Sequence, residues 1–513
     1  MGPEAVRAPD GAPRVVRIRG GTVVAYDAGR GGHELLDGGE VVFQGDRILH
    51  VGGRYAGRVD QEVDARDRLV MPGLVDAHAL MDIGIHLLLW DRVRDEGYRP
   101  RSYVEGETYA FTPEQVETGA EVMLSMLLRS GVTTFCGVNA MALKRWHDEP
   151  WEPPLYAGVA DRLGLRAYLS HHFRSRVPIV GDAEASVLQD ERKGFEGLAH
   201  GVEFVRRAQR GEFGPRTHGL LFPYTQDTVS PDLMRATRTA ADELGVGWRT
   251  HFAQSLHELE DTVARFGRTP IEHLVDLGVL GPDVLLTHCL YGRGHAGGPW
   301  VSDAELRLLA ETGVNVGHTP WIYLFGGRLL SSFGRYRRAG VHVALGTDTY
   351  PGDMLQEMRT AAHMGKVAEH ATGATTAEAA VRSTAAMAFD AATLGGARFL
   401  GRDDLGRLAP GAKADVVLVR TDSASFAPTL DPIRSLVHYA SFRDVDAVWV
   451  DGRKVLDGGQ VPGVDEAEQS ARMGALLGDV AAVLEGWDAE VRGRRTDERW
   501  APGYPRRSVT GSA

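Results

Sequence analysis

Cysteine is nearly absent from this chain: only Cys136 and Cys289 occur among its 513 residues. Two cysteines cannot build a disulfide framework or a cysteine-rich zinc site. Long apolar runs are missing as well, since no stretch approaches the roughly eighteen residues that mark a transmembrane helix. The segment Met1–Arg14 is polar and rich in proline and glycine, without the apolar core of a signal peptide. These absences predict a cytoplasmic protein with a flexible N-terminus and no membrane partner.

Positive charge is also in deficit. Lysine and arginine number 57 against 69 aspartates and glutamates, so 57 − 69 gives a net charge of −12. A nucleic-acid phosphate backbone would be repelled overall by such a protein, which argues against nucleic-acid binding. We therefore expect a small-molecule substrate, although charge does not identify it. We also expect a homodimer or a higher homo-oligomer.

Short strand-and-turn patterns mark both ends of the chain. Residues 15–70 alternate apolar and polar positions around glycine turns, with a hairpin expected at Gly45-Asp46. The pattern returns at residues 401–466, with a second hairpin at Asp451-Gly452. Because so small a set of strands is too short to be stable alone, we expect the two ends to pair into one discontinuous β-sandwich. Residues 467–513 are predicted to form an amphipathic helix and a loosely held tail.

Between these ends, residues 71–400 alternate apolar strand-like runs with helical segments. One helix is expected to begin after Thr112, an N-cap residue followed by Pro113, and to end near Ser130. Eight strand–helix units in series are typical of a (β/α)8 TIM-like barrel, the fold class that we predict. The expected strands are residues 69–75, 132–135, 165–170, 218–223, 248–251, 284–288, 314–318 and 341–348.

Four of these apolar runs close on a histidine or an aspartate. The first, Val70-Met71-Pro72-Gly73-Leu74-Val75-Asp76-Ala77-His78, ends at His78, and later runs end at His251, His288 and Asp348. A single histidine after a strand is more often structural than functional. Four such endings are hard to explain by packing, because a barrel exposes its reactive groups at the carboxyl ends of its strands.

Imidazole and carboxylate groups are ligands for zinc, iron and manganese. His78, His251 and Asp348 would supply three protein ligands and leave one position for water, the usual composition of a catalytic zinc site. We predict one divalent transition metal, zinc in the first place, with Fe2+ or Mn2+ as alternatives. Such a metal lowers the pKa of bound water to about 7. Asp348 could also accept the proton of that water, and His288 could polarise the substrate or stabilise a developing anion.

The chain resembles the amidohydrolase superfamily, and within it the branch of chlorohydrolases and of guanine, S-adenosylhomocysteine and triazine deaminases. The motifs that carry the resemblance span nearly the whole chain in the family's order. They are Pro72-Gly73-Leu74-Val75-Asp76-Ala77-His78, Ser130-Gly131-Val132-Thr133-Thr134-Phe135, Thr250-His251-Phe252-Ala253-Gln254-Ser255, Thr287-His288-Cys289, Leu345-Gly346-Thr347-Asp348 and Leu408-Ala409-Pro410-Gly411-Ala412-Lys413-Ala414-Asp415-Val416. The resemblance implies a metal-dependent hydrolase that acts on a carbon–nitrogen bond, other than a peptide bond, of a small polar heterocycle.

Two positions depart from the family pattern. The family has His-x-His where this chain has His78-Ala79-Leu80, so one of the usual metal ligands is missing. The family's His-x-x-Glu, whose glutamate shuttles protons to the leaving amine, is here His251-Phe252-Ala253-Gln254. An amide can hydrogen-bond but cannot carry a proton at neutral pH, so Gln254 stays in the predicted catalytic set only as a hydrogen-bonding group. A milder change is Gly317-His318-Thr319-Pro320-Trp321, where the family has His-Cys-Pro followed by Asn.

The substrate pocket is predicted from histidines and aromatic residues near the strand ends. The predicted substrate residues are His171, His172, His318, Trp90 and Trp321. Other aromatic candidates are Tyr98, Tyr103, Tyr224, Trp300 and Tyr323, each of which could equally pack the barrel. The long connection from Leu80 to Phe111 is read as an active-site loop. His86, His171 or His172 could replace the missing metal ligand, and no spacing singles one of them out.

Two other readings stay open at this point. One is a barrel enzyme without a metal, or one that catalyses an elimination or a decarboxylation. The other is an inactive binding or assembly protein, against which the retained His251, His288 and Asp348 count because such a protein gains nothing structural from them.

Overall fold

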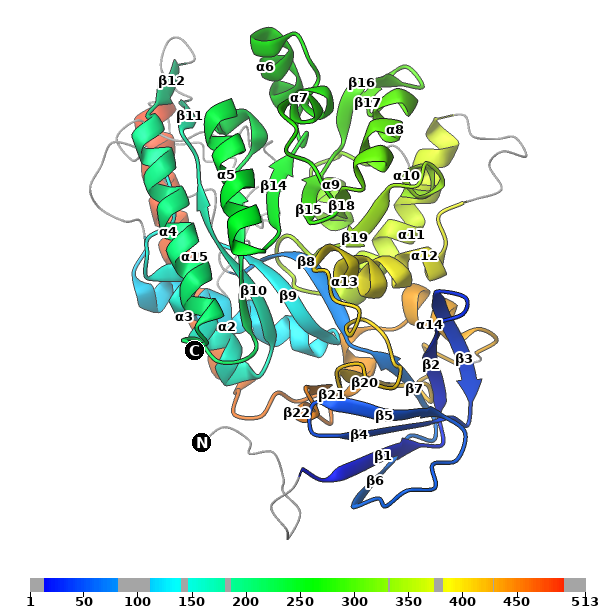
Figure 1. Cartoon of the computed structure of the whole chain (residues 1–513). Coiled ribbons are helices and arrows are strands. Elements are labelled where there is room, and N and C mark those ends of the chain that lie inside the picture. The colour runs from blue at the N-terminus through cyan, green and yellow to red at the C-terminus, as the bar shows by residue number, and fades with distance from the viewer. Residues whose placement is uncertain are drawn as a thin grey trace, which may run out of the picture.

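The computed structural model describes residues 13–81, 111–139, 146–179, 186–330, 333–372, 382–427 and 429–492. Its largest element is an eight-stranded parallel sheet whose neighbours follow chain order. The strands are β8 (Leu74–Leu80), β9 (Val132–Val138), β10 (Arg166–Phe173), β13 (Thr217–Pro223), β14 (Trp248–Phe252), β15 (Val284–His288), β18 (Asn315–His318) and β19 (His342–Leu345). Beyond β19 the chain returns to β8, where Asp348 N–H donates to His78 O at 2.7 Å and Leu80 N–H donates to Asp348 O at 2.5 Å. The predicted barrel is confirmed (Figure 1).

Helices follow the strands and cover the barrel. They include α2 (Pro113–Arg129), α3 (Glu152–Leu163), α4 (Glu191–Gln209), α5 (Pro231–Leu244), α6 (Leu256–Phe266), α7 (Pro270–Leu277), α8 (Asp303–Thr312), α9 (Pro320–Phe325), α10 (Phe333–Arg338) and α11 (Met354–Ala371). Local sequence explains their ends: Thr112 caps α2 in a reciprocal capping box with Gln115, and Pro113 occupies the first turn. Ser230 caps α5 by accepting the Leu233 N–H, and Gly245 ends the helix in a left-handed conformation.

The apolar run at the start of the barrel contains two strands, not one. β7 (Arg68–Pro72) pairs antiparallel with β20 (Val416–Arg420), whereas β8 begins at Leu74 and pairs with β9. The prediction of one barrel strand over residues 69–75 was therefore wrong. Gly73 separates the strands, and a Cβ on it would lie 2.1 Å from Thr133 Oγ1. Apolar composition alone cannot reveal this change of sheet, because both strands are buried.

The two ends of the chain share a second unit made of two sheets. The six-stranded sheet has the order β22-β21-β20-β7-β2-β3 and the four-stranded sheet the order β5-β4-β1-β6. The remaining strands of this unit are β1 (Val15–Arg19), β2 (Thr22–Asp27), β3 (Gly32–Asp37), β4 (Glu40–Gln44), β5 (Arg47–Gly52), β6 (Gln61–Asp64), β21 (Val445–Val450) and β22 (Arg453–Asp457). One apolar cluster joins the sheets, with Ile18 and Phe43 on one side and Val70, Leu418 and Trp449 on the other. The antiparallel sheets expected at the termini are present, and the exact domain boundaries stay predictions.

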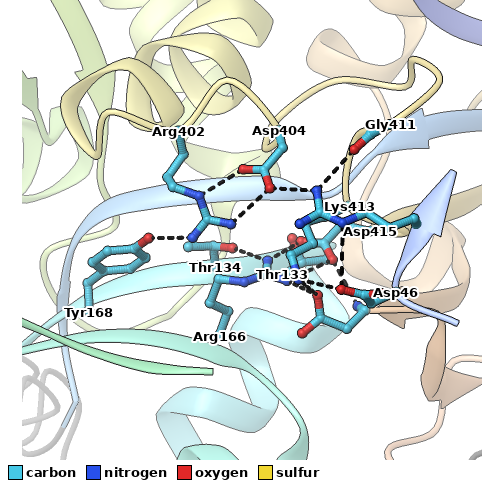
Figure 2. A network of polar contacts seen from close by, with 12 residues as sticks. Asp46, Thr133, Thr134, Arg166, Tyr168, Arg402, Asp404, Gly411, Lys413 and Asp415 are labelled. Atoms are coloured by element: carbon cyan, nitrogen blue, oxygen red, sulfur yellow. Dashed lines mark hydrogen bonds and ion pairs between the residues drawn. The ribbon is translucent and has the colours of Figure 1, made fainter. Parts of the chain in front are cut away.

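A buried polar network connects this unit to the barrel (Figure 2). Arg166 of β10 is 1% exposed and pairs with Asp415, which precedes β20, and with Asp451 in the β21–β22 turn. It also donates to Thr134 Oγ1 of β9 at 3.0 Å. Asp415 in turn accepts the Asp451 N–H at 2.9 Å. Two distant parts of the sequence are thus held against the barrel by one guanidinium group.

The last described helix, α15 (Glu466–Arg492), lies against α2. Gln469 Nε2 donates to Ser125 Oγ at 3.1 Å, and Arg472 pairs with Glu121 at 2.5 Å. Within the described ranges, no helix combines the length and apolarity that a membrane crossing requires.

Candidate metal and catalytic centre

Three histidines converge inside the barrel at the carboxyl ends of three of its strands. His78 belongs to β8, His251 to β14 and His288 to β15, and one nitrogen of each lies within 4.8 Å of the others. The Nε2 atoms of His78 and His251 are 3.1 Å apart. The rings are buried, with exposed fractions of 0%, 5% and 2%. The sequence predicted these three residues, and the barrel brings them together.

The outer nitrogen of each ring faces an oxygen atom. His251 Nδ1 lies 2.9 Å from Tyr224 O, and a carbonyl can only accept, so Nδ1 carries the hydrogen and Nε2 carries the lone pair. His78 Nδ1 lies 3.3 Å from Thr287 Oγ1, and His288 Nδ1 lies 3.1 Å from Thr319 Oγ1. Such contacts fix ring orientation in metal sites.

Burial keeps these imidazoles neutral. Burial, with a smaller contribution from the neighbouring His78, lowers the pKa of His251 to about 3 against the opposing effect of Asp348. Burial also holds the pKa values of His78 and His288 well below the ordinary value. Neutral imidazole is the form that binds a metal.

Asp348 completes the centre from the end of β19. Its Oδ1 lies 3.6 Å from His78 Nε2, and its backbone is left-handed, with φ of 57°. The preceding Thr347 is anchored to buried Asp76, which accepts from Thr347 Oγ1 at 2.6 Å and from His78 N–H at 3.0 Å. Burial raises the pKa of Asp76 to about 6 against these hydrogen bonds. One buried carboxyl group therefore ties the segment of His78 to that of Asp348.

This donor set fits a divalent transition metal. Zinc lies about 2.0–2.1 Å from each histidine nitrogen in proteins, so two ligands at tetrahedral angles are roughly 3.3 Å apart. The observed 3.1 Å between His78 and His251 Nε2 matches that separation. His288 adds a third nitrogen to this group, and Asp348 Oδ1 lies 3.6 Å from His78 Nε2. The assignment of His78, His251 and Asp348 to the metal and of His288 to the substrate stays a prediction from the sequence.

The two departures from the family pattern have defined surroundings. Leu80 packs with Val138, Phe222 and Tyr224 in a small apolar cluster beside the histidines. Gln254 is half-buried. Its N–H donates to Glu258 Oε2 at 2.9 Å, and its carbonyl accepts from Arg328 at 3.0 Å. An apolar wall thus stands where the family's second histidine would be.

The predicted substrate residues lie in several places. His172 faces the inner side, with its ring 5.3 Å from that of Tyr224. His318 lines a small hollow together with Tyr323 and Arg328. Trp321 lies in the first turn of α9 (Pro320–Phe325) and donates its backbone N–H to Glu357 Oε2 at 3.1 Å. Their roles stay predictions.

Other members of that prediction lie away from the centre or outside the described residues. The His171 ring belongs to another histidine cluster, with His147 and His200. Trp300 is half-buried in β17 (Gly298–Trp300), a two-stranded sheet with β16 (Tyr291–His295). Trp90, His86, Tyr98, Tyr103 and the loop from residue 82 to residue 110 lie outside the described residues.

Sequence reasoning missed three buried polar residues near the site. Arg249 lies inside the barrel and donates to Cys136 O at 2.8 Å, and burial lowers its pKa to about 10. Glu357 is buried, which raises its pKa well above the ordinary value. Asp148 contacts His172 Nδ1 at 2.7 Å. A charged residue inside the apolar run Trp248-Arg249-Thr250 was a usable signal for the first, whereas Glu357 and Asp148 gave none.

Known proteins share this architecture. A 5-methylthioadenosine/S-adenosylhomocysteine deaminase from Desulforudis audaxviator is 30% identical and covers 85% of this chain and 94% of its own length. A 5'-deoxyadenosine deaminase from Methanosarcina barkeri is 29% identical over 84% of this chain and 91% of its own. A zinc-bound adenosine deaminase from Xanthomonas campestris superposes with a TM-score of 0.71 at 24% identity, covering 92% of this chain and 99% of its own. Zinc-complexed atrazine chlorohydrolase from Arthrobacter aurescens TC1 has a TM-score of 0.73 at 22% identity, with 90% and 100% covered.

An eight-stranded barrel with histidines and an aspartate at its strand ends defines a class of hydrolase that typically uses a divalent metal. The amidohydrolase family matches residues 69–455, and the chain belongs to that family. The predicted resemblance is confirmed. So is the predicted enzyme class, a hydrolase of carbon–nitrogen bonds other than peptide bonds, in a family that typically binds a divalent metal.

Proposed function

We propose that this enzyme hydrolyses the exocyclic carbon–nitrogen bond of an adenosine-like heterocycle and releases ammonia. The observation that carries the proposal is the convergence of His78, His251 and His288 on one point beside Asp348. The deaminase relatives, which match over more than four fifths of this chain, support an adenosine-like substrate class. His78, His251 and Asp348 would hold the metal, and zinc is the metal that we propose.

Bound at this centre, a divalent metal would lower the pKa of a water molecule to about 7 and so supply hydroxide at neutral pH. The chain's own groups do the rest. The Asp348 carboxylate, beside His78 Nε2, accepts the proton that the attacking water loses. A carbon–oxygen bond forms at the ring carbon, the carbon–nitrogen bond breaks, and the proton leaves with the nitrogen.

Delivery of that proton is where this chain differs from its family. With an amide at Gln254, Asp348 must pass the proton to the leaving nitrogen directly or through His288. Because burial keeps His288 neutral, its ring has one donor and one acceptor nitrogen. Thr319 Oγ1 lies 3.1 Å from Nδ1 and orients the ring. We therefore assign His288 to the stabilisation of charge on the substrate.

A second candidate reaction follows from the same amide. A leaving group that departs as an anion, such as chloride on a triazine-like ring, needs no proton from position 254. Leu80 in the apolar wall with Phe222 and Tyr224 is compatible with such an uncharged ring. The choice between the two reactions is a choice of leaving group at one centre.

Product analysis on matched substrates tests both proposals. Adenosine, 5'-deoxyadenosine, 5'-methylthioadenosine and S-adenosylhomocysteine would be compared with a chlorinated aminotriazine, with ammonia and chloride measured separately. Zinc-loaded protein should release ammonia from at least one nucleoside, and Asp348→Asn should not. Chloride release alone would establish the second reaction. Absence of both products with zinc, iron and manganese would refute the proposed function.

The assembly and location of the enzyme also belong here. We propose a cytoplasmic homodimer or higher homo-oligomer. Light scattering of the purified full chain tests the oligomer, and fractionation of the source cells tests the compartment.

A further inference from the structure

A second group of three histidines lies on the outer side of β10. His147 comes from the segment that begins at Trp146, His171 from β10 and His200 from α4. One nitrogen of each lies within 4.8 Å of the others. His171 is buried and the other two are half-buried. None of the three is part of the catalytic centre described above.

The backbone brings these residues together by close packing. Arg174 N–H donates to Trp146 O at 2.9 Å and Asp148 N–H donates to His172 O at 3.1 Å, so the segment at His147 runs along the end of β10. On α4, a Cβ at Gly197 would lie 2.4 Å from the Cβ of Phe173 and 2.8 Å from that of His147. Glycine at this position therefore allows the helix to approach both segments.

The nitrogens are arranged as in a ligand set. His147 Nδ1 lies 2.8 Å from Asp148 O and must donate to it, which leaves the Nε2 lone pair facing the cluster. His200 Nδ1 is buried and has no hydrogen-bond partner among the described residues. Glu196, one turn before His200 on α4, places Oε1 at 3.9 Å from His147 Nε2. Its other oxygen accepts from Lys193 at 2.9 Å.

The distances between the three imidazole rings also fit a shared metal ion. Ring centroids are 5.9 Å apart for His147 and His171, 5.1 Å for His147 and His200, and 5.2 Å for His171 and His200. Three imidazoles around one tetrahedral zinc have centroids roughly 5.2 Å apart, given the usual zinc–nitrogen distance. The catalytic histidines show nearly the same spread, from 4.8 to 5.7 Å.

We propose that His147, His171 and His200 form a second, structural zinc site, with Glu196 as the fourth ligand. Three imidazoles and one carboxylate are suitable zinc ligands, and a closed set of four protein ligands is typical of a structural site. The proposal moves His171 from substrate binding to metal binding. It does not depend on the reaction at the catalytic centre.

The site would tie the outer side of β10 to the pocket wall. His147 is followed by Asp148, whose carboxylate contacts His172 Nδ1 at 2.7 Å and accepts from Asn139 Nδ2 at 2.6 Å. His172 faces Tyr224, whose carbonyl holds His251. A zinc ion bound between His147 and α4 would fix the segment that carries Asp148, and with it this buried chain of contacts.

Zinc stoichiometry in matched variants tests the proposal. Full-length protein would be stripped with a chelator, reloaded with zinc, dialysed and analysed for metal. The background variant His251→Ala/Asp348→Asn disables the catalytic centre, so only the second site should bind. We expect about one zinc per chain in this background and the loss of that equivalent on adding His200→Ala. His370→Ala, an exposed histidine on α11, is the matched control and should retain the zinc.

Cobalt gives an independent readout of geometry. Co2+ added to the background variant should produce the visible absorption of a tetrahedral site, and His147→Gln should abolish it. This smaller change also serves if His200→Ala does not fold. Glu196→Gln should weaken zinc binding by about tenfold or more, since mutation even of outer-shell partners typically costs about 10–100-fold in metal affinity.

The outcomes separate this site from the catalytic one. A background variant that binds no zinc, or one that keeps its zinc after both His200→Ala and His147→Gln, overturns the second site. Wild-type protein that binds one zinc, lost with His200→Ala but not with His251→Ala, supports the second site and refutes the catalytic metal instead.

Discussion

The Nε2 atoms of His78 and His251 lie 3.1 Å apart inside the barrel, although 173 positions separate the two residues in the chain. The Tyr224 carbonyl fixes the proton of His251 on the far nitrogen, so its lone pair faces His78. Two buried neutral imidazoles at this separation are arranged for a shared cation. Most of what this enzyme is expected to do depends on this pair and on Asp348 beside it.

Purified protein should carry a transition metal at this pair. Elemental analysis of protein purified without added metal is expected to show zinc, or iron or manganese, and His251→Ala should lose about one equivalent. Well under one metal per chain, together with no effect of added metal on stability or turnover, would show that the hydroxide mechanism is wrong.

Asp348→Asn and His288→Ala should each abolish turnover. The carboxylate is needed to take a proton and the imidazole to stabilise charge, and such losses typically raise the barrier by several kcal/mol. Both residues belong to the centre rather than to the main apolar core, so the thermal midpoint of the metal-free variants should stay within a few degrees of wild type. Wild-type turnover in either variant would remove that residue from the mechanism.

Leu80→His and Gln254→Glu restore the two residues that the family has at these positions. They test whether the centre is an ordinary deaminase site that has lost two groups or a site adapted to a different reaction. Leu80 packs against Val138 and Phe222, and a carboxylate at position 254 would lie near the buried Glu258, which already accepts the Gln254 N–H. A half-buried charge placed beside another carboxyl group is costly. We expect both changes to reduce native turnover, by about tenfold or more.

The measurement for this pair is native turnover and metal affinity in the two single variants and the double. In an ordinary deaminase site that had only lost two groups, Leu80→His should tighten metal binding and Gln254→Glu should raise deaminase activity. Higher native turnover in the double variant would contradict a site adapted to a different reaction.

Acid should destabilise the fold through its buried histidines. Burial, with a smaller effect from Arg407, lowers the pKa of His33 to about 4. Between pH 6.5 and pH 4 the His33 imidazole is protonated in the unfolded chain but stays neutral in the folded protein. The stability that is present above pH 6.5 is therefore lost as the pH falls toward 4. For His33 the loss at pH 5 is up to about 2 kcal/mol.

Denaturant unfolding of metal-free protein at pH 7 and pH 5 measures this effect. His33→Gln should reduce the difference between the two pH values, and the exposed His370→Gln is the control. An unchanged difference in His33→Gln would show that His33 does not carry the effect.

Asp415→Asn should destabilise the junction between the barrel and the terminal sheets. The carboxylate is the buried partner of Arg166, and breaking a buried ion pair from one side costs about 3–5 kcal/mol. Asp457→Asn, which breaks an exposed pair with Lys454, should cost about 0–1 kcal/mol. Equal midpoints of unfolding for the two variants would contradict the role given to Asp415.

The sequence by itself determined the barrel, the terminal sheets and the histidines that meet at the strand ends. Its signals were local: apolar runs of strand length, caps such as Thr112, turns at Gly45-Asp46 and Asp451-Gly452, and a histidine or aspartate closing four runs. Each depends on neighbours in the chain, and parallel strands then place their carboxyl ends together.

Only the tertiary structure decided the rest. The split of the first run at Gly73 depends on Thr133, a residue of another strand. His171 and His172 are adjacent in sequence, yet successive strand residues point to opposite faces, so one ring meets His147 and His200 while the other meets Asp148 and Tyr224. Spacing cannot distinguish these roles, because partners from a loop, a helix and a neighbouring strand fix them, and those partners meet only when the barrel closes.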